Sequence, residues 1–222
     1  MKIDILFLNN EMDGHDEYFE NDLFKEYCET HSFEGKKNQI LSVPPSYSNN
    51  ENLTFLVGLG ENKEDINFYD LGILIGSKIK SDAEIKFLNN VGDTNIIIDG
   101  ILYVQYKFNN YKSEDDSSVN NIIFQDLDSS ENEIKKNSVF WVRDLINTPA
   151  LDKSPEEFIN KVNELVDSSG IEVEAYDQKW LEKNDFGGVL GVGKGSDRPP
   201  YFLVGKYNSK AKYQVSLIGK GV

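Results

Sequence analysis

The sequence predicts an α/β protein in two parts that a helix joins. Short apolar runs such as IDILFL and FLVGLG place hydrophobic side chains on both faces of an extended chain, which is typical of strands in a buried parallel sheet. Segments with apolar residues at helical spacing alternate with these runs, as they do in α/β folds. A polar, acidic junction at residues 128–131 divides the elements into two series. We therefore expect a domain boundary at that junction.

Strands and helices alternate through the first series. The apolar pattern predicts buried strands at residues 2–9 and 54–59. Between them, residues 10–53 are expected to form a helix and a long loop. Leucine and isoleucine at helical spacing predict a helix over residues 71–79, and residues 84–88 follow as a short strand.

A further helix and a further strand complete this series. The helix is predicted over residues 97–108, because four apolar residues repeat there at i, i+4, i+7 and i+11. Gly100 lies within it, at a place where close helix packing would leave no room for a side chain. Residues 121–127 supply the strand. The apolar stripe of the helix consists of Ile97, Ile101, Val104 and Phe108.

The second series begins with a helix over residues 131–147. It ends there because the residue before Pro149 is disfavoured in the helical region. The string SPEE at residues 154–157 is a capping box with proline at the first helical position, and it predicts another helix that Gly170 closes. Apolar and acidic residues alternate over residues 171–175, which predicts a half-exposed strand.

A helix, a loop and two strands are expected over the remaining residues. The helix lies around Trp180, the glycine-rich loop at residues 187–196, and the strands at residues 201–207 and 213–218. The stretch GVLGVGKG nearly spells the phosphate-binding loop G-x-x-x-x-G-K-[ST], but Gly195 stands where that motif needs a hydroxyl, and a strand is expected to follow instead of a helix. This argues against nucleotide hydrolysis and favours a tight turn before a core strand.

Composition and charge exclude several classes of function. The chain has a net charge of -15 and its 23 lysines and arginines are interleaved with acids, so we expect no nucleic-acid partner. The apolar runs are too short to span a bilayer and the N-terminus has no leader pattern, so we expect a cytoplasmic protein with no membrane partner. One cysteine and two histidines cannot furnish a structural zinc site with four nitrogen or sulfur ligands, so any metal would be held mainly by oxygen ligands.

Three short strings carry a family resemblance. They are RDLINTPA at residues 143–150, GVGKGSDRPPY at residues 191–201 and LIGKGV at residues 217–222. With their spacing, they resemble the leucine aminopeptidase (cytosol aminopeptidase) family of two-metal exopeptidases, whose members remove N-terminal residues from peptides. The stretches FLVGLG and DGILYVQYKFNNYK in the first series are similar to the same family.

The resemblance implies a fold, a substrate class and an assembly. Residues 1–128 would form an N-terminal α/β domain with a mixed sheet, and residues 129–150 an interdomain helix. Residues 151–222 would form the start of an α/β catalytic domain that is incomplete in this chain. Peptides would be the substrates, two divalent ions (zinc or manganese) the cofactors of the full-length protein, and a homohexamer the assembly.

Lys220 is the candidate metal ligand. Taken by itself, a lysine that follows an apolar strand is more often a plain surface residue. In the family, the lysine of the string G-K-G-[VI] binds one of the two metals as a neutral amine, which requires a pKa that the nearby dication depresses. The family's other ligands and catalytic residues lie past the position of Val222. We therefore expect no catalytic residue, no bound metal and no activity in the chain as given.

Two hypotheses about function remain open. In the first, the chain is the N-terminal portion of a leucine aminopeptidase-like metalloexopeptidase. In the second, it is a non-catalytic α/β module that acts in binding or assembly. Asp144 and Asn147, the polar residues within RDLINTPA, are expected to cap the helix end and tie the two domains together, without a catalytic role. A reading frame that continues after Val222 as T-F-D-x-G-G would favour the first hypothesis.

Overall fold

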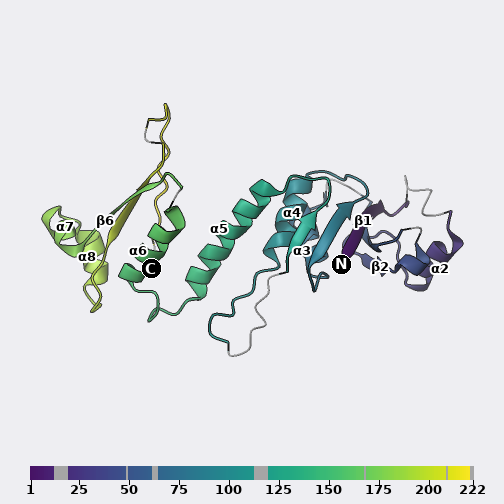
Figure 1. Cartoon of the computed structure of the whole chain (residues 1–222), viewed down its shortest axis with the longest axis horizontal. Helices are drawn as coiled ribbons and strands as arrows, with labels where there is room; N and C mark the ends of the chain where they lie inside the picture. Colours follow the sequence, from purple (N-terminus) through teal and green to yellow (C-terminus); the bar gives the residue numbers. More distant parts are fainter. Residues whose placement is uncertain are drawn as a thin grey trace. The chain divides into compact units, whose positions relative to one another are not determined.

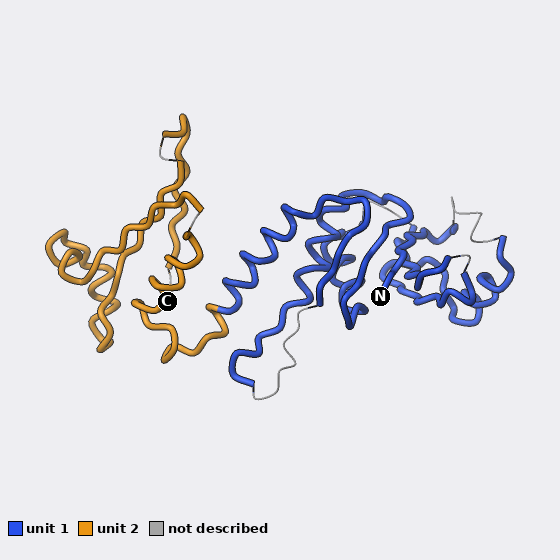
Figure 2. The backbone as a smooth tube through the Cα atoms, viewed as in Figure 1, with its two compact units in different colours: residues 1–144 blue, residues 145–222 orange. Residues whose placement is uncertain are grey.

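The computed structural model describes residues 1–222 with the exception of residues 13–19, 49, 62–64, 113–119, 168, 209 and 221–222. The chain divides into two compact units, residues 1–144 and residues 145–222 (Figure 2). Each unit contains a sheet and helices, which confirms the α/β class. None of the helices described is both long enough and apolar enough to cross a membrane.

The first unit contains a five-stranded mixed sheet with the strand order β2-β3-β1-β4-β5 (Figure 1). Strands β3, β1, β4 and β5 run parallel to one another, and β2 pairs with β3 in the antiparallel direction. The mixed sheet that the family resemblance implies is therefore confirmed. The strands are β1 Lys2–Asn9, β2 Ile40–Val43, β3 Leu53–Gly60, β4 Ala83–Phe87 and β5 Ile122–Phe124.

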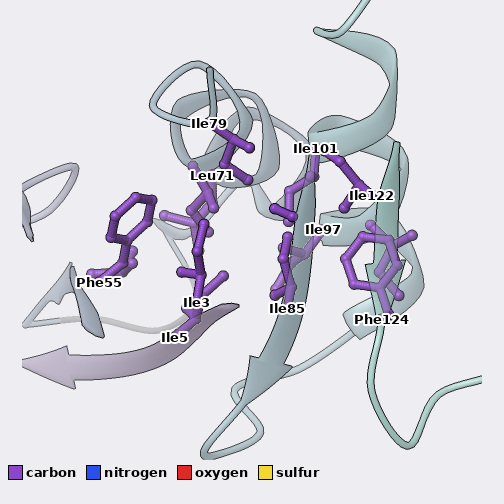
Figure 3. Close-up of a cluster of buried hydrophobic side chains, with 14 of the residues drawn as sticks. Ile3, Ile5, Phe55, Leu71, Ile79, Ile85, Ile97, Ile101, Ile122 and Phe124 are labelled. Atoms are coloured by element: carbon purple, nitrogen blue, oxygen red, sulfur yellow. The ribbon is translucent and has the colours of Figure 1, made fainter. Parts of the chain in front are cut away.

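Helices cover both faces of this sheet. One buried cluster joins Ile3 and Ile5 of β1 to residues of α3 and α4 (Figure 3). A second cluster joins Leu6 and Leu8 of β1 to Phe24 of α2. Because successive side chains of a strand point to opposite faces, α2 lies on the face opposite to α3 and α4. The helices are α2 Asp22–Thr30, α3 Phe68–Gly76 and α4 Thr94–Tyr103, and a short 3-10 helix η1 covers Pro45–Tyr47.

Side-chain caps explain where these three helices begin. The side-chain oxygen of a cap residue accepts hydrogen bonds from backbone N–H groups that have no partner within the helix. Asn21 accepts from Leu23 and Phe24 in α2, and Asn67 and Asp93 act in the same way for α3 and α4. Each of the three helices is thus started by a local signal in the sequence.

Glycines let α3 and α4 approach closely. A Cβ atom on Gly100 would lie 2.3 Å from the carbonyl oxygen of Tyr69, and one on Gly72 would lie 2.2 Å from that of Ile97. Both distances are far inside van der Waals contact. The close packing expected at Gly100 is therefore confirmed, and Gly72 supplies the facing side of the same crossing.

The end predicted for the helix over residues 97–108 was wrong. α4 ends at Tyr103, and Phe108 lies outside any helix. The Gln105 side chain donates to the carbonyl oxygens of Gly76 (2.9 Å) and Ile101 (3.3 Å), which fastens the chain at this point to both helices. Tertiary contacts such as these override a continuing apolar repeat.

Strand β2 was also missed, because it falls within residues 10–53, which were expected to hold only a helix and a loop. It has four residues and its burial rises only at Val43. A strand this short gives almost no periodic signal in the sequence. Its pairing with β3 supplies the structure that the local pattern does not.

The side chain of Asn89 extends the pairing between β1 and β4. Its amide nitrogen donates to the carbonyl oxygen of Phe7 (2.9 Å), and its amide oxygen accepts from the backbone nitrogen of Phe7 (3.0 Å). The register of the two strands ends one step earlier, at Ile5 and Phe87. A side-chain amide thus takes the place of a backbone residue at the carboxyl end of β4.

The long helix α5 (Ser130–Asn147) lies almost where it was predicted, over residues 131–147. Its first turn is fixed to α4 by Asn132, which is only 1% exposed. The Asn132 amide donates to the carbonyl oxygen of Asn95 (2.9 Å) and to the carboxylate of Asp99 (2.7 Å). The buried amide is therefore paired, and α5 is anchored to the first unit.

The second unit contains an antiparallel pair of strands and three short helices (Figure 1). Ser154 caps the first of these helices by accepting a bond of 3.0 Å from the backbone nitrogen of Glu157, which confirms the N-cap of the predicted capping box. The helix ends at Val166, before the predicted end at Gly170. The half-exposed strand expected at residues 171–175 is confirmed as β6. The elements are α6 Pro155–Val166, β6 Glu172–Tyr176, α7 Gln178–Lys183, α8 Gly187–Gly193 and β7 Phe202–Lys206.

The sequence interpretation of the glycine-rich stretch was wrong in part. Residues 187–193 form helix α8 instead of a loop, and its first turn is closed by a hydrogen bond from the backbone nitrogen of Leu190 to the carbonyl oxygen of Phe186 (3.1 Å). The helix forms where Val189 and Leu190 become half-buried. Tight packing is present only at Gly193, where a Cβ would lie 2.9 Å from the Pro200 ring.

The strand predicted at residues 213–218 is absent. The segment does not pair as a strand, and Leu217 and Ile218 are 94% and 96% exposed. A strand needs partners for its backbone N–H and C=O groups. Among the described residues, the second sheet contains only β6 and β7, which pair with each other. High β-propensity alone therefore does not make a strand here.

Candidate functional site: the motif strings of the second half

The start of RDLINTPA anchors α5 to the first unit. The Tyr106 hydroxyl donates to the Asp144 carboxylate (2.8 Å), and Arg143 donates to the carbonyl oxygen of Tyr103 (2.8 Å). The Arg143 guanidinium lies 5.3 Å from the centre of the Tyr106 ring, and Phe140 packs edge-on against the same ring. Arg143 and Asp144, the two charged residues of the string, therefore have a structural role: they fix α5 to the residues that end and follow α4. The tie between domains that was expected of Asp144 stays a prediction.

A tight turn follows α5 at the end of RDLINTPA. The backbone nitrogen of Asp152 donates to the carbonyl oxygen of Pro149 (3.0 Å) and closes the turn. The Lys153 ammonium donates to the carbonyl oxygen of Leu145, one of the last carbonyls of α5. Cationic groups commonly bind such carbonyls, which have no partner within the helix.

Arg198 joins this turn to the second motif string. Its Nη1 donates to the carbonyl oxygen of Ala150 (2.8 Å), and its Nη2 donates to that of Leu151 (3.0 Å). The strings RDLINTPA and GVGKGSDRPPY, which are 40 residues or more apart in sequence, are therefore in contact. Sequence reasoning quoted Arg198 within its string but gave it no role. One available signal was that the chain has only two arginines, and each lies in a motif string.

An aromatic cluster packs the elements of the second unit together. Tyr176 of β6 stacks on Trp180 of α7 at 4.1 Å, and Trp180 lies 5.2 Å from Phe186. Phe186 in turn lies 5.3 Å from Phe202 of β7. Leu181, on the same helix as Trp180, is fully buried. This cluster packs α7 and the N-cap residue of α8 against β6 and β7.

A hydrogen-bonded group on the same sheet contains Glu174, Tyr176 and Lys206. Glu174 accepts from the Lys206 ammonium and from the Tyr176 hydroxyl. The bond from Lys206 is the main reason that the pKa of Glu174 is lowered, and Glu174 in turn raises the pKa of Lys206 and of Tyr176. All three groups are satisfied by one another across β6 and β7. The arrangement is that of a cross-strand pair on a sheet surface.

The described residues do not by themselves form a metal site. Lys220 is exposed, and a Cβ on its neighbour Gly219 would meet no atom within 4 Å. Among the residues that the structure describes, no group of three or more His, Cys, Asp or Glu side chains is placed to hold a metal. A single amine cannot hold a divalent ion, because such ions take four or more ligands. The residues present therefore do not fit the metals that the resemblance implies.

The single cysteine is not a nucleophile. Cys28 lies on α2 and is 4% exposed. Burial, with a smaller contribution from the charge of Glu29, raises the pKa of its thiol to about 11. The thiolate, which is the reactive form, is therefore scarce at neutral pH. Of the two histidines, His31 donates from Nδ1 to the carbonyl oxygen of Tyr27 (2.8 Å), and His15 lies outside the described residues.

A cavity of about 270 Å³ opens at the carboxyl end of β3 in the first unit. Asn10, Gly60 and Asp65 are among the residues that line it. Lys37 also lines it, and its ammonium donates to the carbonyl oxygen of Asp65 (2.6 Å). None of the three motif strings contributes to this cavity.

Comparison with known proteins places the motif strings in one family. The catalytic domain of the cytosol aminopeptidase family matches residues 140–222, a range that contains all three strings. A probable cytosol aminopeptidase of Shewanella oneidensis is 30% identical in an alignment of 214 positions that covers 86% of this chain and 41% of that protein. Residues 140–222 therefore match the catalytic domain of the cytosol aminopeptidase family, and the relatives named here are cytosol aminopeptidases. The resemblance seen in the sequence is thereby confirmed.

Further cytosol aminopeptidases are similar over different lengths. A probable cytosol aminopeptidase of Rhodococcus opacus is 44% identical in an alignment of 87 positions that covers 38% of this chain and 17% of that protein. The crystal structure of a cytosol aminopeptidase from Coxiella burnetii has the same fold, with a TM-score of 0.69 at 22% identity over 91% of this chain and 43% of that one. The chain thus spans less than half the length of these relatives.

Proposed function

We propose that this chain supplies the N-terminal α/β domain and the first part of the catalytic domain of a leucine aminopeptidase-like metalloexopeptidase. Such an enzyme removes N-terminal residues from peptides. The observation that carries the proposal is the match of the family's catalytic domain to residues 140–222. The contact of Arg198 with Ala150 and Leu151 supports it, because it brings two strings of that match together.

Lys220 is the metal ligand that we propose within this chain. Its amine would bind one of two divalent ions, zinc or manganese, in company with carboxylates from other residues of a family enzyme. In a full-length family enzyme such ions would supply Lewis-acid chemistry, and Lys220 would be one of the groups that hold them. The described residues provide too few ligands to hold an ion, so the 222 residues alone are proposed to be inactive.

The remaining properties of the proposed enzyme follow from the family. Peptides are its substrates, a homohexamer is its assembly and the cytoplasm is its compartment. The negative charge of -15 supports the absence of a nucleic-acid partner. These statements are proposals for a protein of the family's full length.

Grafting tests the proposal. Residues 140–222 of this chain replace the corresponding segment of the Rhodococcus opacus relative, to which it is similar over 87 residues. We expect the graft to hydrolyse leucine amide in the presence of manganese. Replacing Lys220 by alanine should lower kcat/KM by about 100-fold, which corresponds to a loss of ~3 kcal/mol of transition-state stabilisation. The same change at Lys210, an exposed lysine of the same segment, should leave activity unaltered.

Two checks make the graft decisive. Circular dichroism and gel filtration establish that each graft is folded, and the manganese content of each protomer reports metal binding without reference to turnover. A folded graft that neither binds metal nor hydrolyses leucine amide would contradict the proposal and favour a binding or assembly module. Full activity after Lys220→Ala would remove Lys220 from the site.

A further inference from the structure

We propose that Arg198 is a positioning residue that clasps the connector, defined as residues 148–153, to the second motif string. The clasp consists of the two bonds from its guanidinium to the carbonyl oxygens of Ala150 and Leu151. Its consequence for catalysis rests on the proposed function, because the two joined strings belong to the matched catalytic domain. The clasp itself is a property of this chain and is measured on it.

The turn in the connector leaves two carbonyl groups to be bound from outside. The bond from the nitrogen of Asp152 to the oxygen of Pro149 closes the turn. Ala150 and Leu151 are the central residues, and the carbonyls of central residues take no part in such a closing bond. Arg198 donates to both of these carbonyls.

Burial does not hold the connector in place. All four residues of the turn, 149–152, are exposed, and the Leu151 side chain is 78% exposed. Segments with few buried apolar contacts open at low cost in free energy. The polar contacts of the connector therefore decide its position, and the bonds from Arg198 are the two that reach it from the second motif string.

The shape of the guanidinium suits this role. Two adjacent carbonyls need two donors that point the same way from one rigid plane, and Nη1 and Nη2 provide them at 2.8 and 3.0 Å. A lysine ammonium is a compact point charge without that fork. A lysine at this position can therefore replace part of the contact but not all of it.

The backbone behind Arg198 is held as well. Its nitrogen donates to the Ser196 hydroxyl (3.1 Å), and the nitrogen of Ser196 donates to the carbonyl oxygen of Gly193 (3.0 Å). The prolines at 199 and 200 restrict the residues that follow. The arginine side chain thus starts from a fixed backbone, so that little freedom is lost when it binds the turn.

Hydrogen exchange of the 222-residue chain tests the clasp. We expect Arg198→Ala to speed exchange in peptides that cover the connector by about five- to tenfold, in line with the loss of charge-assisted bonds at an exposed site. Trypsin should cleave after Lys153 faster by a similar factor. Arg198→Lys should lie between wild type and Arg198→Ala. Lys194→Ala removes one positive charge from the same exposed string and should behave as wild type.

Chemical rescue separates a clasp from a general structural role. Millimolar guanidinium should restore protection of the connector in Arg198→Ala and should leave Lys194→Ala unchanged. Unchanged exchange in Arg198→Ala would overturn the proposal, and so would an increase spread equally over α6 and β6. Full protection in Arg198→Lys would overturn the requirement for a fork. Because no step measures catalysis, an inactive graft would count against the proposed function and not against the clasp.

Discussion

The Tyr106 hydroxyl and the Asp144 carboxylate form a hydrogen bond of 2.8 Å that spans 38 residues of sequence. Tyr106 lies just after α4, and Asp144 lies in the last turn of α5. The bond therefore fixes the far end of the long helix to the first unit. Because the bond is partly buried, we expect it to contribute more to the free energy of folding than a bond in open solvent.

Removal of this bond should loosen α5. We expect Tyr106→Phe to lower the free energy of unfolding by about 1 kcal/mol, the usual contribution of such a bond. Urea denaturation followed by circular dichroism measures the change. Tyr207→Phe serves as the control, because Tyr207 is 71% exposed, and it should change stability by less than about 0.5 kcal/mol. Equal effects of the two substitutions would show that the bond contributes nothing.

The crossing of α3 and α4 should not accept a methyl group. We expect Gly100→Ala to destabilise the first unit by roughly 1–3 kcal/mol, because the added atom would overlap the carbonyl of Tyr69 and force the helices apart. Gly187→Ala is the matched control, since a Cβ atom on Gly187 would meet no other atom within 4 Å. A neutral result at Gly100 would mean that the helices can separate without cost.

The pairing of Glu174 with Lys206 should depend on pH in two directions. The pKa of Glu174 is lowered, so the stabilisation is present above its unfolded pKa and is lost as pH falls through the lowered value. The pKa of Lys206 is raised, so its stabilisation is lost as pH rises through that higher value. We expect Lys206→Ala to move the pKa of Glu174 upward in an NMR titration. Lys210→Ala should leave it in place.

Cys28 should be unreactive in the folded chain. With a pKa of about 11, roughly one thiol in a thousand is ionised at pH 8, and burial blocks access as well. We expect an aromatic disulfide reagent to release no colour at pH 8 within minutes. Addition of urea should produce one equivalent. Rapid reaction without urea would show that α2 opens readily from the sheet.

The 222 residues alone should not hydrolyse leucine amide. Lys220 cannot replace a binuclear site, and added zinc, manganese or cobalt should leave the rate at the level of the buffer blank. Turnover by a pure sample, with a rate proportional to its concentration, would contradict this expectation.

The sequence predicts the elements whose cause is local. β1 and β3 follow from their apolar runs, and α6 follows from its N-cap Ser154 with Pro155 at the first helical position. The pattern fails where a distant contact decides the outcome. Gln105 ends the helical path before Phe108, and no strand pairs with residues 213–218 among the described residues.

The candidate site was also predicted only in part. Its motif strings could be recognised because they are defined by residue types and by spacing along the chain. The partners of Arg198 could not be found, because they lie 47 and 48 residues away along the chain and the acceptors are backbone carbonyls, which every residue has. A backbone carbonyl can accept a hydrogen bond from any residue type, so the sequence around Ala150 and Leu151 does not indicate that Arg198 binds there.

Asn89 occupies the carboxyl end of the sheet in the first unit, between β1 and β4. The strand order changes direction at β1, with β3 on one side and β4 on the other. In open α/β sheets the carboxyl ends at such a reversal usually form the mouth in which ligands bind. Here the amide of Asn89 bridges that mouth by binding both backbone groups of Phe7. At the carboxyl end of β4 a protein side chain therefore occupies the backbone groups of β1 that a ligand at such a reversal could otherwise approach.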